Sequence, residues 1–195
     1  MKKKVLFTLL ILMTGLSGIL FAQDKARVMN EKTITWYGID FTIGRFTSVT
    51  EDPAAIVNQY LKAINDVILA EPEKYNLKTF FSKTEITPSL DQVNEKNAKI
   101  DPGTLVITDK HEVALDDVKK VIKGYNTEGK TGMGLVFVAE NLNKVSQTGS
   151  YYVCFFDLAT RDIIDARRMS AKAAGFGFRN YWAGSAYNVM KAWSK

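Results

Sequence analysis

The sequence predicts an α/β (α+β) fold, a single domain in which helices cover a mixed sheet with antiparallel C-terminal strands. Segments rich in β-branched and aromatic residues alternate with segments of helical periodicity, in the order β-α-α-β-α-β-β-β-α. Residues 151–157 and 163–169 are two strand-like segments separated by five residues, a spacing typical of an antiparallel pair with a short turn.

The first strand and the first helix have the clearest local signals. Residues 33–43 contain β-branched and aromatic residues around Gly38, where we expect a bulge or a close packing contact. Asp52 then provides a helix N-cap directly before Pro53. Apolar residues follow at helical spacing as far as Pro72, which ends the helix.

The middle of the chain has weaker signals. Residues 75–81 are apolar but too short to assign, whereas residues 88–98 predict a second, polar helix. The Asp-Pro-Gly sequence at 101–103 is typical of a turn, and residues 105–108 predict a short strand. Residues 115–124 predict a compact amphipathic helix.

Three strands and a helix complete the chain. Residues 135–139 predict a buried strand, which precedes the antiparallel pair. After a glycine-rich segment at 174–178, the last helix places large apolar residues on one face, among them Trp182 and Trp193.

Residues 1–22 have the composition of a secretory signal peptide. Three lysines form a positive start, an apolar run follows, and Ala22 precedes the expected cleavage site. We therefore expect a mature single domain of residues 23–195 that is periplasmic or secreted, without stable membrane insertion after cleavage. An uncleaved membrane anchor over residues 5–22 is the alternative.

Charge and cysteine content exclude several classes of protein. The formal net charge of +5 includes three leader lysines, so residues 23–195 carry only +2, which implies no nucleic-acid partner. Cys154 is the single cysteine, so no internal disulfide can form, and its apolar strand indicates a core residue. His111 has no second histidine at ligand spacing, so we expect no metal and no cofactor.

Residues 124–131 match the phosphate-binding pattern G-x-x-x-x-G-K-[ST]. Nucleotide binding requires a strand before such a loop and a helix after it. Here a predicted helix comes first and a predicted strand follows, so we expect a helix-to-strand loop. The glycines of residues 175–177 lack the second strand of a dinucleotide site and indicate a tight turn.

A cluster of polar and aromatic residues forms the candidate site: Trp36, Asp40, Arg179, Asn180 and Trp182. If the last helix packs against the first strand, Asp40 and Arg179 form a buried bidentate ion pair. We favour a structural role for this pair over a ligand pocket, because structural ion pairs also produce such clusters.

Further positive charge lies in the last predicted strand and just after it, at Arg167, Arg168 and Lys172. These residues are either a solvated face or a surface that attracts an anionic envelope polymer. Arg167 and Arg168 can also protect the edge of the sheet against pairing with another chain.

Two segments carry a family resemblance: Trp36-Tyr-Gly-Ile-Asp-Phe and Gly175-Phe-Gly-Phe-Arg-Asn-Tyr-Trp182. With Phe156-Asp157, the Thr160-Arg161 turn and the leader ending Phe-Ala-Gln, they resemble uncharacterised small exported proteins of Bacteroidetes-type bacteria. More distantly, the order of elements is similar to the α/β domain of the TolB amino-terminal domain, curli secretion proteins and outer-membrane activators of penicillin-binding proteins. That resemblance implies binding or assembly of envelope components without catalysis, although the chain lacks the lipid-bearing cysteine of many such proteins.

We therefore predict a non-catalytic exported envelope protein, a binding or assembly module whose partner is an envelope protein or an anionic envelope polymer. A hydrolase or transferase with an aromatic-walled cleft around Asp40 and Arg179 is the alternative. Nucleotide binding through residues 124–131 is a second alternative. The sequence determines neither the ligand nor the oligomeric state.

Overall fold

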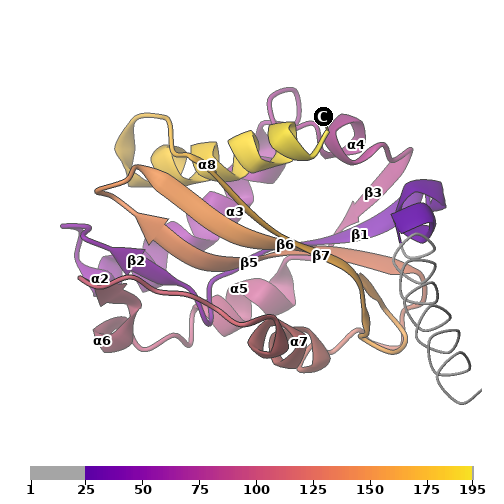
Figure 1. Cartoon of the computed structure of the whole chain (residues 1–195), viewed down its shortest axis with the longest axis horizontal. Helices are drawn as coiled ribbons and strands as arrows, with labels where there is room; N and C mark the ends of the chain where they lie inside the picture. Colours follow the sequence, from indigo (N-terminus) through magenta and orange to yellow (C-terminus); the bar gives the residue numbers. More distant parts are fainter. Residues whose placement is uncertain (1–24, 195) are drawn as a thin grey trace, which may run out of the picture.

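A computed structural model describes residues 25–194, so the predicted signal peptide, residues 1–22, lies outside the described residues. The described chain forms a seven-stranded mixed sheet covered by helices, which confirms the predicted α/β class (Figure 1). The strands are β1 (Thr33–Asp40), β2 (Arg45–Thr47), β3 (Glu85–Pro88), β4 (Val106–Ile107), β5 (Met133–Asn143), β6 (Thr148–Asp157) and β7 (Ile163–Lys172).

Strand β5 is the central strand of the sheet. β6 pairs antiparallel with β5, and β7 pairs antiparallel with β6, which confirms the predicted C-terminal pair. On the other side of β5, β1 lies parallel to its first part and β2 lies parallel to its last part. β3 extends the sheet beside β1, and β4 extends it beside β2.

The helices are α2 (Pro53–Ala55), η1 (Ile56–Tyr60), α3 (Leu61–Ala70), α4 (Leu77–Phe81), α5 (Asp91–Asn97), α6 (Pro102–Leu105), α7 (Leu115–Lys123) and α8 (Gly177–Trp193), and residues 25–30 are also helical. α2, η1 and α3 form the first predicted helix without a break. Asp52 caps it as expected, since its side chain accepts hydrogen bonds from the N–H groups of Ala54 and Ala55. The π-helical turn η1 was not predicted. Within residues 25–194, no helix has the length and apolar character needed to cross a membrane.

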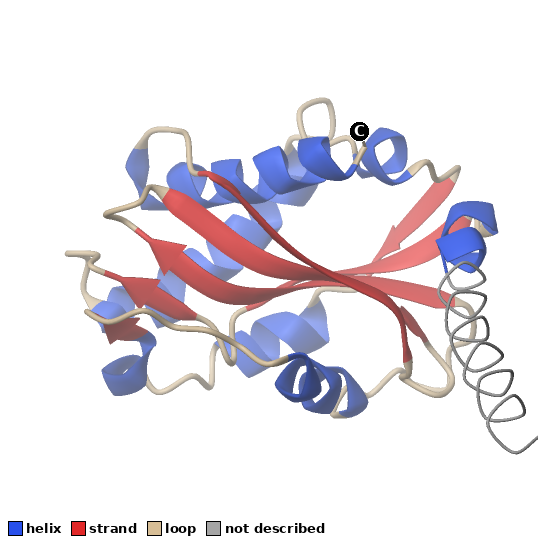
Figure 2. Ribbon diagram, viewed as in Figure 1, coloured by secondary structure: helices blue, strands red, loops and turns tan. Residues whose placement is uncertain are grey.

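Helices cover both faces of the sheet (Figure 2). α3 and α8 lie on one face, where Ile64, Trp182 and Val189 belong to the larger core. α5 and α7 lie on the other face, where Val93 and Ile122 belong to a smaller core. We call these the α8 face and the α7 face. Each large apolar side chain buried in these cores stabilises the fold by about 1.5–3 kcal/mol.

The predicted irregularity at Gly38 is a β-bulge in β1. Gly38 has φ +88°, and the register between β1 and β5 shifts between Trp36 and Ile39. Asn65 bonds both the N–H and the carbonyl oxygen of Ile39, at 2.7 and 3.1 Å, and Asn97 donates to the same carbonyl at 2.9 Å. A Cβ atom at position 38 would lie 2.9 Å from Asn65 Oδ1, so the bulge requires glycine.

Most of the other predicted elements are also found. The helices expected at residues 88–98 and 115–124 are α5 and α7, and the strand expected at 105–108 contains β4. The strand expected at 135–139 is part of the longer β5. Residues 75–81, which had no assignment, contain α4. β2 and β3, strands of three and four residues, were not predicted.

Candidate functional site

The five residues predicted to form the candidate site do not come together. Trp36 is buried on the α8 face against Phe137, and Trp182 lies in the same core. Asp40 is buried on the α7 face, where it contacts Tyr125. Trp36 and Asp40 lie on opposite faces of the same strand because the bulge between them changes the alternation of side chains.

The predicted ion pair between Asp40 and Arg179 is wrong. Arg179 is exposed at the start of α8, where its Nε donates to Asn180 Oδ1 at 3.0 Å. Asp40 accepts instead from the Tyr125 hydroxyl, 2.7 Å from Oδ2, and from the N–H of Thr42, 2.8 Å from Oδ1. Burial, and then the nearby Asp40 carboxylate, raise the pKa of Tyr125 well above its usual value. The described structure therefore has no cleft formed jointly by Asp40 and Arg179.

Residues 124–131 do not have the geometry of a phosphate-binding loop. α7 precedes the segment and β5 follows it. A phosphate-binding loop requires the reverse order, a strand before the loop and a helix after it, so that backbone N–H groups point at the phosphate. Lys130 forms an ion pair with Glu128 at 3.1 Å. The segment is thus the helix-to-strand loop that its neighbours in the sequence predict.

The contacts of the single histidine and the burial of the single cysteine indicate structural roles for both residues. His111 Nε2 lies 2.8 Å from the carbonyl oxygen of Ile43. Cys154 is fully buried, and burial raises the pKa of its thiol, which makes it a poor nucleophile at neutral pH. Among residues 25–194, no three His, Cys, Asp or Glu side chains are grouped closely enough to hold a metal ion.

A hollow lined by polar side chains opens on the α7 face of the sheet. Its volume is about 400 Å³, and none of its lining residues belongs to a helix. Residues of β5, β6 and β7 contribute to it, together with the segment that leads into α7. We call it the polar hollow, and its lining residues are Lys110, His111, Glu140, Asn141, Asn143, Ser146, Thr148, Ser150 and Arg168.

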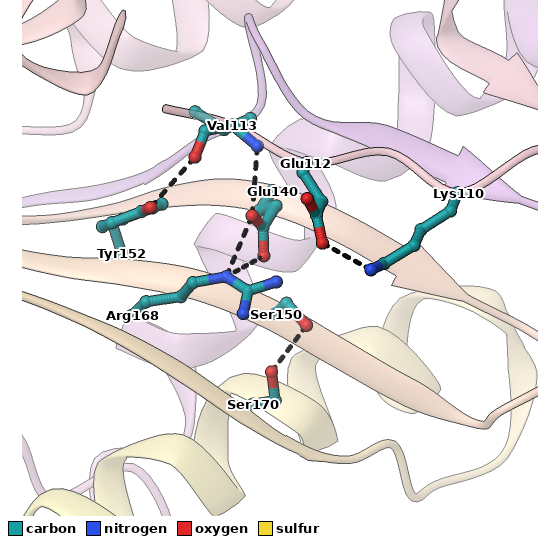
Figure 3. A network of polar contacts seen from close by, with 8 residues as sticks. All are labelled: Lys110, Glu112, Val113, Glu140, Ser150, Tyr152, Arg168 and Ser170. Atoms are coloured by element: carbon teal, nitrogen blue, oxygen red, sulfur yellow. Dashed lines mark hydrogen bonds and ion pairs between the residues drawn. The ribbon is translucent and has the colours of Figure 1, made fainter. Parts of the chain in front are cut away.

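A buried carboxylate and a half-exposed guanidinium meet in the polar hollow (Figure 3). Glu140 occupies a bulge of β5, and only 1% of its side chain is exposed. Arg168, on β7, donates from Nε to both carboxylate oxygens, at 3.0 and 2.8 Å. The N–H of Val113 donates to Glu140 Oε1 at 3.1 Å. These bonds fix the guanidinium, and the hydrogen bond to Glu140 raises the pKa of Arg168.

The outer part of Arg168 has no hydrogen-bond partner in the part of the chain that the structure describes. Its Nη1 and Nη2 atoms form no hydrogen bond to any residue within 25–194, and 48% of the side chain is exposed. The hydroxyls of Ser150 and Ser170 lie nearby and bond one another at 2.6 Å (Figure 3). Tyr152 donates to the Val113 carbonyl oxygen at 2.9 Å and so holds the edge of the hollow against the sheet. The hollow therefore presents oriented N–H and O–H donors.

The edge of the polar hollow carries charges of both signs. Lys110 and Glu112 form an ion pair there, with 77% and 60% of their side chains exposed (Figure 3). Hydrogen bonding to Lys110 lowers the pKa of Glu112. Because both groups are largely solvated, this pair contributes little to stability, and Lys110 can exchange Glu112 for another anion at small cost.

Sequence analysis identified Arg168 as part of a positive surface but did not identify Glu140. The predicted strand ended at Ala139, one residue before Glu140. A single charged residue directly after an apolar run is the signal by which Glu140 could have been identified. Comparisons of the chain with protein-family models, with curated proteins and with solved structures found no match.

Proposed function

We propose that this protein is a non-catalytic, exported binding module of the cell envelope that binds an anionic group, a carboxylate or a phosphate, in the polar hollow. The observation that carries the proposal is the state of Arg168. Its Nε side is fixed by the buried Glu140, and both of its Nη atoms lack a protein partner within the described chain.

The chemistry of Arg168 suits an anion with two oxygen atoms. A guanidinium binds carboxylates and phosphates through parallel N–H···O bonds in one plane. Glu140 occupies Nε and leaves the two Nη groups as the donors for a ligand. Glu140 already orients the Arg168 side chain, so ligand binding carries a smaller entropy cost for ordering it. Ser150 adds a hydroxyl donor beside the guanidinium.

The shape and lining of the polar hollow favour a charged group carried on a larger molecule. Small-molecule pockets enclose their ligand in mostly apolar surroundings, whereas this hollow is lined by polar residues, none of which belongs to a helix. An anionic envelope polymer would present many such groups, and repeated weak contacts raise the total affinity. An anionic envelope polymer is also the partner that the positive charge of Arg167, Arg168 and Lys172 suggests.

The envelope location rests on the leader, residues 1–22, and has its own test. Intact mass and N-terminal sequencing of the protein recovered from its host should give a chain that starts at Gln23. A chain that retains Met1 and stays in the cytoplasm would contradict export, whatever the polar hollow binds.

The binding proposal can be tested with two polyanions, polygalacturonate as the carboxylate probe and polyphosphate as the phosphate probe. Isothermal titration calorimetry at low ionic strength measures their affinity for the protein. Removing the charged hydrogen bonds in Arg168→Ala should weaken binding about tenfold or more. Glu140→Gln keeps Arg168 but releases its orientation and should weaken binding by a smaller factor.

Arg167→Ala is the matched control. Arg167 is the neighbouring residue of β7 and carries the same charge, but it lies 4.1 Å from the Trp193 ring and pairs with Asp165 at 2.8 Å, away from the polar hollow. Its loss should change affinity by about twofold at most, as screened surface charge does. Equal weakening in Arg167→Ala and Arg168→Ala, or no binding of either probe to the parent protein, would overturn the proposal.

A further inference from the structure

Two loops at one end of the molecule present the most exposed large apolar side chains of the described chain. Phe176 is 95% exposed and Val145 is 78% exposed, against 46% for Met29 and 41% for Leu115. Single exposed apolar residues are common on protein surfaces, but two of this exposure at one end require an explanation.

The two loops are joined to one another. Val145 lies in the turn between β5 and β6, and Phe176 lies in the loop between β7 and α8. The N–H of Ala173 donates to the Gln147 carbonyl oxygen at 2.8 Å, and Lys172 Nζ donates to the Ser146 carbonyl oxygen at 2.9 Å. Both loops lie at the end of the sheet opposite residues 25–30 (Figure 1). We call residues 144–147 and 173–177 together the apolar tip.

The backbone around Phe176 holds the ring away from the protein. Gly175 has φ +129° and Gly177 has φ +76°, conformations that glycine adopts without strain. A Cβ atom at position 175 would lie 2.7 Å from the Asn180 carbonyl oxygen, so the loop packs tightly against α8 at its base. Phe176 thus projects from a loop that is itself well packed.

Positive charge surrounds the apolar tip. Lys144 precedes Val145 in its turn, Lys172 is the last residue of β7 before the loop that carries Phe176, and Arg179 is exposed in the first turn of α8. The ammonium of Lys144 lies 3.8 Å from the centre of the Tyr181 ring. Glu51 is the one acidic residue that lines the shallow depression between Lys144 and Phe176. Neither loop of the apolar tip contains an acidic residue, so the charge that the tip itself carries, from Lys144, is positive.

We infer that the apolar tip docks on an anionic lipid surface, with Phe176 and Val145 entering the boundary between headgroups and acyl chains. Ser146 and Gln147 follow Val145 in its turn, and Lys144 and Lys172 lie near the two apolar side chains in the sequence. That arrangement does not form the continuous apolar patch of a protein interface, but each side chain can enter the lipid surface separately. Lysine and arginine then lie at headgroup level, where anionic lipids attract them.

This docking surface shares only Ser146 with the polar hollow, and it does not depend on the proposed anion site. Two apolar side chains and three cations give peripheral, reversible binding, weaker than that of a covalent lipid anchor with two chains. Added salt should weaken the binding because it screens attraction to the headgroups.

The test uses the variant Phe176→Trp and vesicles whose acyl chains carry bromine, which quenches tryptophan on contact. Of the three native tryptophans, Trp36 and Trp182 are buried and Trp193 is partly buried at the C-terminal end of α8, so the parent protein measured in parallel supplies the background. With phosphatidylglycerol vesicles, we expect a blue shift and quenching of the new tryptophan, both absent with phosphatidylcholine vesicles. Quenching shows that this side chain itself enters the lipid, whichever other part of the chain also binds.

Flotation with the same vesicles measures the contribution of each side chain. Phe176→Ser should reduce the bound fraction of the protein about tenfold, and Val145→Ser should reduce it by a smaller factor. Leu115→Ser, on α7, is the matched control and should bind like the parent protein. No quenching of Phe176→Trp, or equal loss in Leu115→Ser and Phe176→Ser, would overturn the inference.

Discussion

The hydrogen bond from Tyr125 to Asp40 should be one of the strongest polar contacts in the protein. Both side chains are buried, the oxygen atoms lie 2.7 Å apart, and no Lys or Arg forms an ion pair with Asp40 in the described chain. The remaining donors to Asp40 are the N–H and the hydroxyl of Thr42. Tyr125→Phe removes a donor to a buried carboxylate and should destabilise the fold by about 2–3 kcal/mol.

Urea denaturation of single and double variants measures this contact. In the Asp40→Asn background the charge is absent, so Tyr125→Phe should cost about 1 kcal/mol less than it costs in the parent protein. Tyr37→Phe is the matched control: the Tyr37 ring stacks on Tyr125 with centroids 5.9 Å apart, but its buried hydroxyl has no partner among the described residues. Loss of that hydroxyl should change stability by less than about 0.5 kcal/mol.

The pH dependence gives a second test at the same tyrosine, whose pKa is raised first by burial and then by the Asp40 carboxylate. Because the pKa of Tyr125 is raised in the folded state, its contribution to stability is complete below pH 10 and is lost as the pH rises further, where the unfolded chain ionises. Tyr125→Phe should remove part of this alkaline loss of stability. Equal costs for Tyr125→Phe and Tyr37→Phe, or the same cost of Tyr125→Phe in both backgrounds, would refute the assigned contact.

Two further variants test the bulge of β1 and the anchoring of the N-terminal segment. Gly38→Ala adds backbone strain and a close contact with Asn65 and should cost about 2–4 kcal/mol in thermal unfolding. Gly177→Ala, with positive φ but open space around it, should cost about 1–2 kcal/mol; equal costs would contradict the contact at Gly38. The hydrogen bond from Arg27 lowers the pKa of Asp157, so Asp157→Asn should cost up to about 1 kcal/mol at pH 7. That difference should vanish as the pH falls below about 4, and a difference independent of pH would contradict the ion pair.

The sequence predicted the elements of the fold better than it predicted which side chains meet. Asp52, before the first helix, and the short turn between β6 and β7 are local signals, and both elements have the predicted form. The bulge at Gly38 was also predicted. Its effect on the alternation of side chains between the two faces of β1 was not predicted. One inserted residue was enough to place Asp40 on the face opposite Trp36 and Trp182.

The polar hollow depends on contacts between residues far apart in the chain. Arg168 on β7 contacts Glu140 on β5 across the intervening strand β6. Val113 contacts Glu140 from the segment before α7. No local periodicity encodes such a meeting, although an acidic residue directly after an apolar run indicates that it needs a partner. The exposure of Phe176 is also a tertiary property, since Phe176 and Phe178 lie two residues apart in one segment and yet only Phe178 is buried.

An NMR titration with inorganic phosphate tests whether the polar hollow binds an anionic group through Arg168. Backbone resonances and the arginine Nε–Hε signals would be followed at constant ionic strength. We expect saturable shifts at Arg168, Ser150 and Ser170, together with an Arg167 signal that does not move. Shifts spread over exposed lysines without saturation, or an Arg168 signal that does not respond, would contradict it.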